Sequence, residues 1–358
     1  MDPLHVAVAL NTTGWHPASW REPDARPADL LTPSYWVDLV TEAERGAVDF
    51  VTFDDALTLQ PAGVRGRLDA VLTAARVAPL TRRIGLLPTV IATHTEPFHL
   101  SKAIATLDYV SAGRAGVHVQ VAAGDDAARH FGRRATPASP RELYDEAADY
   151  VEVLRRLWDS WEDDAEIRDT ATGRFIDRAK LHYIDFEGKW FSVKGPSITP
   201  RPPQGQPLVA ATADGEDSWP FIAGSADIAF VSAQSAGAEG TLGQARIFTD
   251  IAVFLDDTPE RAQARRRRLD DRHGAEFTGT AEVFAGTPVQ LADLLQDWAT
   301  SGVTGVRLLP AVLPHDLQQI SSALATELQR RGLTNSRPGS TLREVLGLSR
   351  PTNRYATA

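Results

Sequence analysis

The sequence predicts a (β/α)8 barrel with insertions. Short apolar runs typical of buried strands alternate with helix-length segments along the chain, and this alternation is typical of βα units around a parallel sheet. A chain of 358 residues is long enough for two average domains or for one large barrel. Eight strand-like runs favour the barrel. They are Val6–Leu10, Phe50–Phe53, Ile84–Leu87, Ala115–Val119, Leu208–Thr212, Ile228–Val231, Ile247–Phe254 and Val306–Leu309.

A segment long enough for a helix follows each of these runs. In the fourth segment, the apolar residues Tyr150, Leu154, Leu157, Trp158 and Trp161 recur at spacings that place them on one helix face. The expected helices are Tyr35–Gly46, Leu68–Ala78, His99–Ser111, Glu142–Ser160, Asp217–Ala223, Pro259–Arg272, Pro288–Ser301 and Asp316–Arg331.

Three segments interrupt the regular alternation, namely Ala56–Arg67, roughly Trp161–Pro207, and Asp256–Gly286. The first follows the second predicted strand, where a lid or pocket wall lies in such barrels. The second is too long for an ordinary βα connection, and we expect it to serve function or oligomerisation. We therefore expect a single barrel over residues 1–335, with insertions near 56–67, 161–207 and 256–286, and a C-terminal tail over 336–358.

Composition narrows the function. With 37 Lys and Arg against 47 Asp and Glu, the net charge is −10, which argues against a nucleic-acid partner. The run ARRRRLDDRHG is followed at once by acidic Asp270 and Asp271, so an exposed helix face explains it better than a nucleic-acid site. The chain has no cysteine, which excludes disulfides, thiolate nucleophiles and cysteine-ligated metals.

The N-terminus lacks the basic and apolar regions of a signal peptide, and no apolar stretch approaches the roughly 20 residues of a membrane span. We therefore expect a cytoplasmic protein without a membrane partner. No G-x-G-x-x-G follows the first strand, and no Walker loop, G-x-S-x-G or H-E-x-x-H motif is present. No metal site is expected.

The candidate site residues are polar side chains at the C-terminal ends of predicted strands, where the catalytic groups of such barrels gather. Asp54 and Asp55 end the second strand. Asp55 is either a base, or a hydrogen-bond acceptor for a heterocyclic N–H, or a cap for the next turn, whereas a capping role is favoured for Asp54.

The loop after the third strand contains Thr89 and His94. His94 is either a general acid/base or anion-binding group, or a surface or capping histidine. On the fourth strand, His118 shares one side with Gln120 by the alternation of strand side chains. His118 either lines a pocket or is an interior histidine with satisfied hydrogen bonds.

Three blocks carry a family resemblance: LSKAIATLDYVSAGR at 100–114, LWDSWEDDA at 157–165, and EGKWFSVKGPSITPRPPQGQP ending at Pro207. Over most of the chain to about Arg331, the sequence resembles the bacterial-luciferase-like flavin monooxygenases. It is similar in particular to the branch with nitrilotriacetate, dibenzothiophene-sulfone and pristinamycin-pathway monooxygenases.

The resemblance implies a (β/α)8 barrel that takes reduced FMN from a separate flavin reductase. It further implies reaction of the flavin with O2 to a C4a-peroxyflavin, oxygenation of a small organic substrate, and a homodimer. The protein then supplies orientation and exclusion of water. By the same resemblance, Asp55 and Thr89 lie beside the isoalloxazine ring and Tyr144 contacts the flavin.

Other positions depart from the family pattern. His118 replaces an asparagine that contacts the flavin, and Leu143 replaces an arginine. The phosphate-binding turn, approximately Gln-Ala-Gly-Ser-Ser in relatives, is ATADG here, with Asp214 and Gly215 at its end. Two anions about 4 Å apart at an effective dielectric constant of about 20 repel by roughly 4 kcal/mol, which corresponds to about three powers of ten in affinity.

Three explanations fit these departures: weak and transient binding of reduced FMN, a different or reoriented cofactor, or loss of the flavin. The leading hypothesis is a two-component flavin-dependent monooxygenase with His94 and His118 as catalytic candidates. The alternative is a flavin-independent barrel, either a non-redox enzyme or a small-molecule binding protein, with His94, His118, Asp54 and Asp214 around its pocket.

Overall fold

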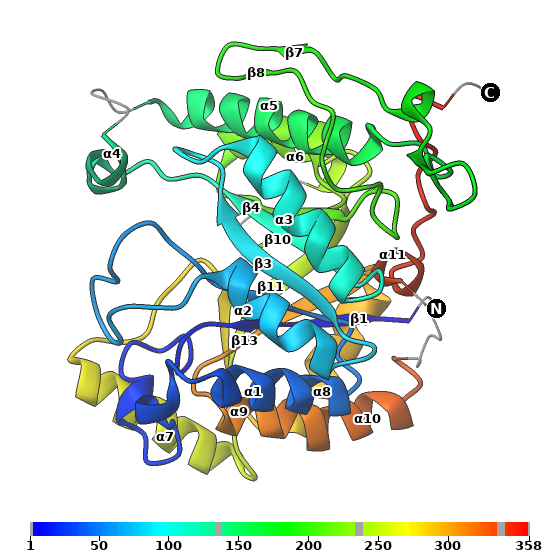
Figure 1. Cartoon of the computed structure of the whole chain (residues 1–358). Coiled ribbons are helices and arrows are strands. Elements are labelled where there is room, and N and C mark those ends of the chain that lie inside the picture. Colours follow the sequence, from blue (N-terminus) through cyan, green and yellow to red (C-terminus); the bar gives the residue numbers. More distant parts are fainter. Residues whose placement is uncertain (1–2, 133–137, 233–238, 335–340, 357–358) are drawn as a thin grey trace.

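The computed structural model describes residues 3–132, 138–232, 239–334 and 341–356 and shows a closed parallel barrel surrounded by helices (Figure 1). The predicted fold is therefore confirmed. Each barrel strand pairs in parallel with the next, and the last pairs with the first. In order around the barrel the strands are β1 (His5–Leu10), β2 (Phe50–Phe53), β3 (Gly85–Ile91), β4 (Gly116–Gln120), β9 (Leu208–Thr212), β10 (Ile228–Val231), β11 (Arg246–Leu255) and β13 (Gly305–Pro310).

Side-chain caps set the start of several helices. Ser139 and Glu142 form a capping box at the start of α5, and Asp69 accepts a hydrogen bond from the backbone N–H of Leu72. The cap at Asp69 explains why α2 begins two residues after its predicted start. The outer helices are α1 (Pro33–Arg45), α2 (Ala70–Val77), α3 (Pro97–Val110), α5 (Pro140–Asp159), α6 (Trp219–Ser225), α7 (Pro259–His273), α8 (Pro288–Thr300), and α9 (His315–Gln319), which a π-helical turn (Ile320–Leu324) joins to α10 (Ala325–Arg330).

Several short elements were not predicted. Strand β12 (Glu282–Gly286) pairs with the second half of β11, so part of the expected insertion 256–286 extends the sheet, and α7 belongs to the outer helices. Helix α4 (Asp125–Phe131) follows β4. The 161–207 segment forms two small hairpins, β5–β6 (Glu166–Asp169 and Arg174–Ile176) and β7–β8 (Phe186–Glu187 and Ser192–Val193).

The C-terminal segment closes the N-terminal end of the barrel. Leu342 of α11 (Leu342–Val345) and the following Leu346 pack inside the barrel against Phe50, Leu87 and Phe248. Gly85 makes room for this plug, because a Cβ atom at Gly85 would lie 2.6 Å from Leu342. The predicted boundary at 335/336 lies outside the described residues, but residues 341–356 pack on the barrel.

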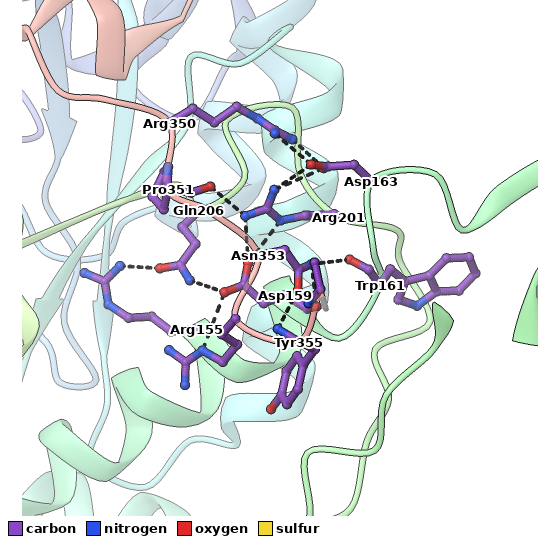
Figure 2. A network of polar contacts seen from close by, with 12 residues as sticks. Arg155, Asp159, Trp161, Asp163, Arg201, Gln206, Arg350, Pro351, Asn353 and Tyr355 are labelled. Carbon is purple, nitrogen blue, oxygen red and sulfur yellow. Dashed lines mark hydrogen bonds and ion pairs between the residues drawn. The ribbon is translucent and has the colours of Figure 1, made fainter. Parts of the chain in front are cut away.

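A network of ion pairs holds this segment to the 161–207 insertion and to the end of α5 (Figure 2). Arg201 donates to Asp159 at 3.0 Å, to Asp163 at 3.0 Å and to the Pro351 carbonyl at 2.8 Å. Arg350 donates to both oxygens of Asp163, at 2.6 and 2.9 Å. The hydrogen bonds from Arg350 and Arg201 lower the pKa of Asp163 to about 2. The 161–207 insertion thus holds in place the C-terminal segment that closes the barrel.

The arginine run of α7 does not form an entirely exposed helix face, contrary to expectation. Arg265 is buried between Glu22 and Asp316. Arg268 and Arg272 also pair with the buried Glu22, while Arg267 is exposed. The run therefore binds α7 to the loop after β1. No helix in the described ranges has the length and apolar composition that a membrane span requires.

Candidate active site

The inward-facing side chains are apolar at the N-terminal end of the barrel and polar nearer its C-terminal face. Leu87 and Leu208 belong to the apolar cluster, and residues two or four positions apart on a strand point to the same side. Thr89 and Thr212, two and four residues further along their strands, therefore also face inward. His118 lies between these threonines on β4. Its Nδ1 is 3.1 Å from Thr89 Oγ1, and its Nε2 is 3.0 Å from Thr212 Oγ1. Both nitrogens of a buried imidazole are thus hydrogen-bonded.

His118 is held in an environment that disfavours its charged form. Burial lowers the pKa of His118 well below its usual value, and the charge of Arg307 lowers it further. The Phe230 ring meets the imidazole edge-on at 5.0 Å between centroids. Arg307 lies 3.5 Å over Phe230 and makes two hydrogen bonds to Asp250, at 2.7 and 2.6 Å. His118 is therefore neutral at neutral pH.

The two carboxylates that end β2 have different partners. The Asp54 carboxylate pairs with Arg67 at 2.5 Å and also accepts a hydrogen bond from the backbone N–H of Asp55. Asp55 instead accepts hydrogen bonds from the backbone N–H groups of Ala56 at 2.7 Å and of Ala70, the first residue of α2, at 3.0 Å. Local patterns assigned Asp54 to a cap and did not indicate Arg67, which lies 13 residues away in sequence.

Two buried polar atoms near this pair have no hydrogen-bond partner among the described residues: Nε of Arg67 and Oδ1 of Asn11. Asn11 follows β1, whose last residue, Leu10, accepts a hydrogen bond from the Asp54 N–H. Buried polar atoms are normally hydrogen-bonded. These two are therefore available to a ligand or to water at the C-terminal end of β1 and β2.

A pocket of about 500 Å³ lies between the C-terminal ends of β2 and β3 and the flanking helices α2 and α3. Asp55, Thr89 and His94 line it, with apolar walls that include Leu57 and Phe131. His94 stacks on Phe131 of α4 at 5.5 Å between ring centroids, and His130 hydrogen-bonds the Leu57 carbonyl at 2.9 Å. Segment 56–67 thus contributes a pocket wall, as predicted, together with α4.

The turn after β9 carries three exposed carboxylates, those of Asp214, Glu216 and Asp217. Gly215 has a φ of +81°, and no atom lies within 4 Å of the place a Cβ would occupy. Tyr144 of α5 stacks on Phe221 at 6.0 Å between ring centroids. Burial raises the pKa of Tyr144 to about 12, and the negative charges of Asp214 and Asp217 contribute. The electrostatic potential around this turn is therefore negative.

The sequence-predicted residues form one arc, since β2, β3, β4 and β9 are neighbours in the sheet. Asp55, Thr89 and His94 share the pocket, and His118 connects Thr89 to the strand that leads into the turn at Asp214 and Gly215. The arc lies at the C-terminal face, where barrel enzymes place their active sites. Sequence reasoning missed the roles of Thr212, Arg67 and the Asp250–Arg307 pair. Strand alternation would have placed Thr212 inward, and charged Asp250 and Arg307 within apolar runs were a further signal.

Comparison with known proteins identifies the family. A family model described as luciferase-like monooxygenase matches residues 12–272. The chain belongs to the luciferase-like monooxygenase family. This luciferase-like monooxygenase is 29% identical to the N-acetyl-S-(2-succino)cysteine monooxygenase of Bacillus subtilis, over 99% of this chain and 98% of the relative. It is 25% identical to nitrilotriacetate monooxygenase component A of Aminobacter aminovorans, over 99% and 98%. The dibenzothiophene-sulfone monooxygenase of Rhodococcus erythropolis is 28% identical, over 98% and 97%.

Solved structures support the same fold. A long-chain alkane monooxygenase has a TM-score of 0.85 at 22% identity, covering 97% of this chain and 96% of its own. A riboflavin lyase, solved with modified FMN and riboflavin, has a TM-score of 0.86 at 24% identity, covering 98% and 97%. The family model thus confirms the family resemblance inferred from the sequence blocks, and the solved structures confirm the fold.

The residues of this monooxygenase fit the ring of a flavin better than its phosphate. The pocket at Asp55 and Thr89 joins apolar walls to a few polar groups, as pockets for small molecules and cofactors do. The turn at Asp214 and Gly215 places carboxylates where the family resemblance places the phosphate. Within residues 3–132, 138–232, 239–334 and 341–356, no group of three or more His, Asp or Glu side chains is arranged to hold a metal ion.

Proposed function

We propose that this chain is the oxygenase component of a two-component monooxygenase that takes reduced FMN from a separate flavin reductase and oxygenates a small organic substrate with O2. The observation that carries the proposal is one shared pocket. Asp55 and Thr89, the positions that the resemblance places beside the flavin ring, line it together at the C-terminal face of a barrel of this family. The nitrilotriacetate relative is named as component A of a monooxygenase, which supports a partner protein for this chain as well.

Reduced FMN supplies the electrons that activate O2, and the chain's own residues orient the ligands and exclude water. Leu57 and Phe131 contribute apolar walls to the pocket. Thr89 offers a hydroxyl to the bound ligand. His94 lies in the same pocket as the candidate general acid/base. His118 is buried between two hydroxyls and neutral, so its role is hydrogen bonding rather than proton exchange with the ligand.

The acidic turn at Asp214 implies weak binding of the FMN phosphate. Weak binding does not prevent turnover, because an oxygenase that receives its flavin from a reductase needs the ligand only for the duration of a cycle. We also propose a homodimer, which rests on the family resemblance.

Anaerobic titration of the purified protein with reduced FMN, followed by tryptophan fluorescence, tests the flavin step. Saturable binding at micromolar to submillimolar concentration is expected. A second assay supplies a flavin reductase, 18O2 and a panel with dibenzothiophene sulfone, nitrilotriacetate and N-acetyl-S-(2-succino)cysteine, and mass spectrometry detects one added 18O atom. No binding up to millimolar FMN, together with no oxygenated product, would overturn the proposal and leave the flavin-independent barrel.

A further inference from the structure

We propose that His118 and Thr212 are positioning residues that set the direction of the hydrogen bond offered by Thr89 inside the C-terminal end of the barrel. Thr89, His118 and Thr212 would form one directional chain across β3, β4 and β9. The proposal deepens the proposed function, because the ligand that reads the Thr89 hydroxyl there is the flavin or the substrate bound beside it.

The geometry leaves the imidazole no freedom to bond elsewhere. His118 is 2% exposed, and each ring nitrogen is within 3.1 Å of one threonine oxygen. Strands β3 and β9 are not neighbours, because β4 lies between them. Any hydrogen-bond coupling between Thr89 and Thr212 along this route therefore passes through the His118 ring.

A neutral imidazole has one N–H donor and one acceptor nitrogen. One threonine must therefore donate its proton to the ring while the other accepts a proton from it. The threonine that accepts keeps its own O–H free to donate to a ligand, and the threonine that donates has only lone pairs left to offer. Thr89 and Thr212 thus have opposite hydrogen-bonding character, and a change of tautomer reverses both together.

The surroundings keep the ring in this neutral form. A protonated imidazole would donate from both nitrogens and make both threonines acceptors. Arg307 places a positive charge near the ring, and its partner Asp250 is committed to it by two hydrogen bonds. Phe230 covers the ring with its edge. These neighbours come from β13, β11 and β10, so the wall opposite His118 favours the uncharged ring.

A double-mutant cycle tests the coupling. The affinity of reduced FMN is measured anaerobically for the native protein, Thr89→Val, Thr212→Val and the double variant. The combined effect is expected to differ from the product of the single effects by at least about twofold, the lower end of the range measured for groups in one hydrogen-bond network. In a His118→Leu background the two effects should multiply. Simple multiplication in the native background would overturn the proposal.

Two further variants separate positioning from general damage. Thr212→Ser keeps the hydroxyl and should restore native affinity, whereas Thr52→Val removes an inward threonine of β2 that is buried and should show no coupling to Thr89→Val. Coupling of Thr52→Val equal to that of Thr212→Val, or failure of Thr212→Ser to restore affinity, would contradict the proposal.

A spectroscopic measurement does not need the flavin and remains informative if His118→Leu fails to fold. The two 15N resonances of the His118 ring should show one dominant neutral tautomer at pH 7. Thr212→Val, which removes the partner of Nε2, should shift the Nδ1 resonance as well, and Thr89→Val should shift Nε2. If each change moves only the adjacent nitrogen, the directional chain does not exist. If no flavin binds but these cross-effects occur, the proposed function is wrong and the directional hydrogen-bond chain through Thr89, His118 and Thr212 is supported.

Discussion

Asp214 lies exposed on the turn after β9, at the position that the family resemblance assigns to the FMN phosphate. The sequence predicts a large penalty for a phosphate beside this carboxylate, but the structure places Asp214 on the exposed side of its turn. Charges exposed to water are screened, with a Debye length of about 10 Å at 0.1 M salt. The repulsion is therefore smaller than an estimate for a buried pair, and its salt dependence is the observable that identifies it.

Replacing Asp214 by Ser should raise the affinity for reduced FMN by about threefold to tenfold at low salt, because exposed charge interactions contribute about 0.2–1 kcal/mol, with additional repulsion from the double charge of the phosphate. The gain should shrink at 0.5 M NaCl. Isothermal titration under anaerobic conditions measures both. Asp271→Ser removes an exposed charge from α7 and should change nothing. Unaltered affinity in D214S at low salt would show that the phosphate does not meet this carboxylate.

His118 also predicts a pH dependence of stability. Its pKa in the folded state is lowered below the usual 6.5, so below pH 6.5 the unfolded chain binds a proton that the folded chain does not. Stability contributed by this group is thus fully present above pH 6.5 and is lost as the pH falls from 6.5 towards the folded-state pKa.

Urea unfolding at pH 7 and pH 5 measures this loss. His118→Asn should lose less stability over this interval than the native protein, whatever its stability at pH 7. His16 has a pKa lowered by burial and remains in both proteins, so a residual loss is expected. Equal losses in both proteins would mean that His118 is protonated in the folded state.

At the scale of secondary structure, the α7 arginines pair with a residue that lies far away in the sequence. The Glu22 side chain is 3% exposed. It forms ion pairs with Arg268 at 2.6 Å, with Arg265 at 3.8 Å and with Arg272. The charge pattern of residues 264–274 alone indicates an exposed helix. Glu22 lies more than 240 positions away in sequence, and local reasoning therefore could not assign it as the partner.

Glu22→Gln should destabilise the protein by about 2 kcal/mol, because a buried carboxylate is replaced and its arginines lose their counter-charge. Urea unfolding measures the change. The matched control is Arg267→Gln, since Arg267 belongs to the same run but is exposed and should shift stability by no more than about 0.5 kcal/mol. Equal effects of the two substitutions would show that the helix is held by its apolar face alone.

The barrel strands were predictable because such strands are buried on both faces and therefore read as apolar runs. Each predicted run is a strand of the barrel. Strand β12 was not predictable, because its one strand partner among the described residues is the end of β11, and its burial depends on that partner. For the site, strand ends identified Asp55, Thr89 and His118. The partners that determine their chemistry, Thr212 for His118 and Arg67 for Asp54, depend on pairings between segments that periodicity does not reveal.

For the whole molecule, the two ends of the barrel have separate tasks. The C-terminal face carries the polar arc from Asp55 to Asp214, whereas the opposite end is closed by Leu342 and Leu346. The plug is tied in place by Arg343, which donates to the Gln206 carbonyl and pairs with Asp227, and by the Arg350–Asp163–Arg201 network. Stability and ligand binding should therefore respond to different substitutions.

Leu342→Ala tests this separation. The side chain is 1% exposed within the barrel, and removing a buried leucine costs about 2–5 kcal/mol through lost burial and the cavity left behind. Val345→Ala, in the same short helix but only partly buried, should cost less than about 1.5 kcal/mol. The urea midpoint should therefore fall clearly further in L342A. Under folding conditions, both variants should bind reduced FMN as the native protein does, because the plug lies at the end of the barrel away from Thr89 and His118. If L342A unfolds at the same midpoint as V345A, the C-terminal segment is an accessory that the barrel does not need. If it folds fully but loses the ligand, the two ends are coupled through the interior layers between Leu87 and Thr89.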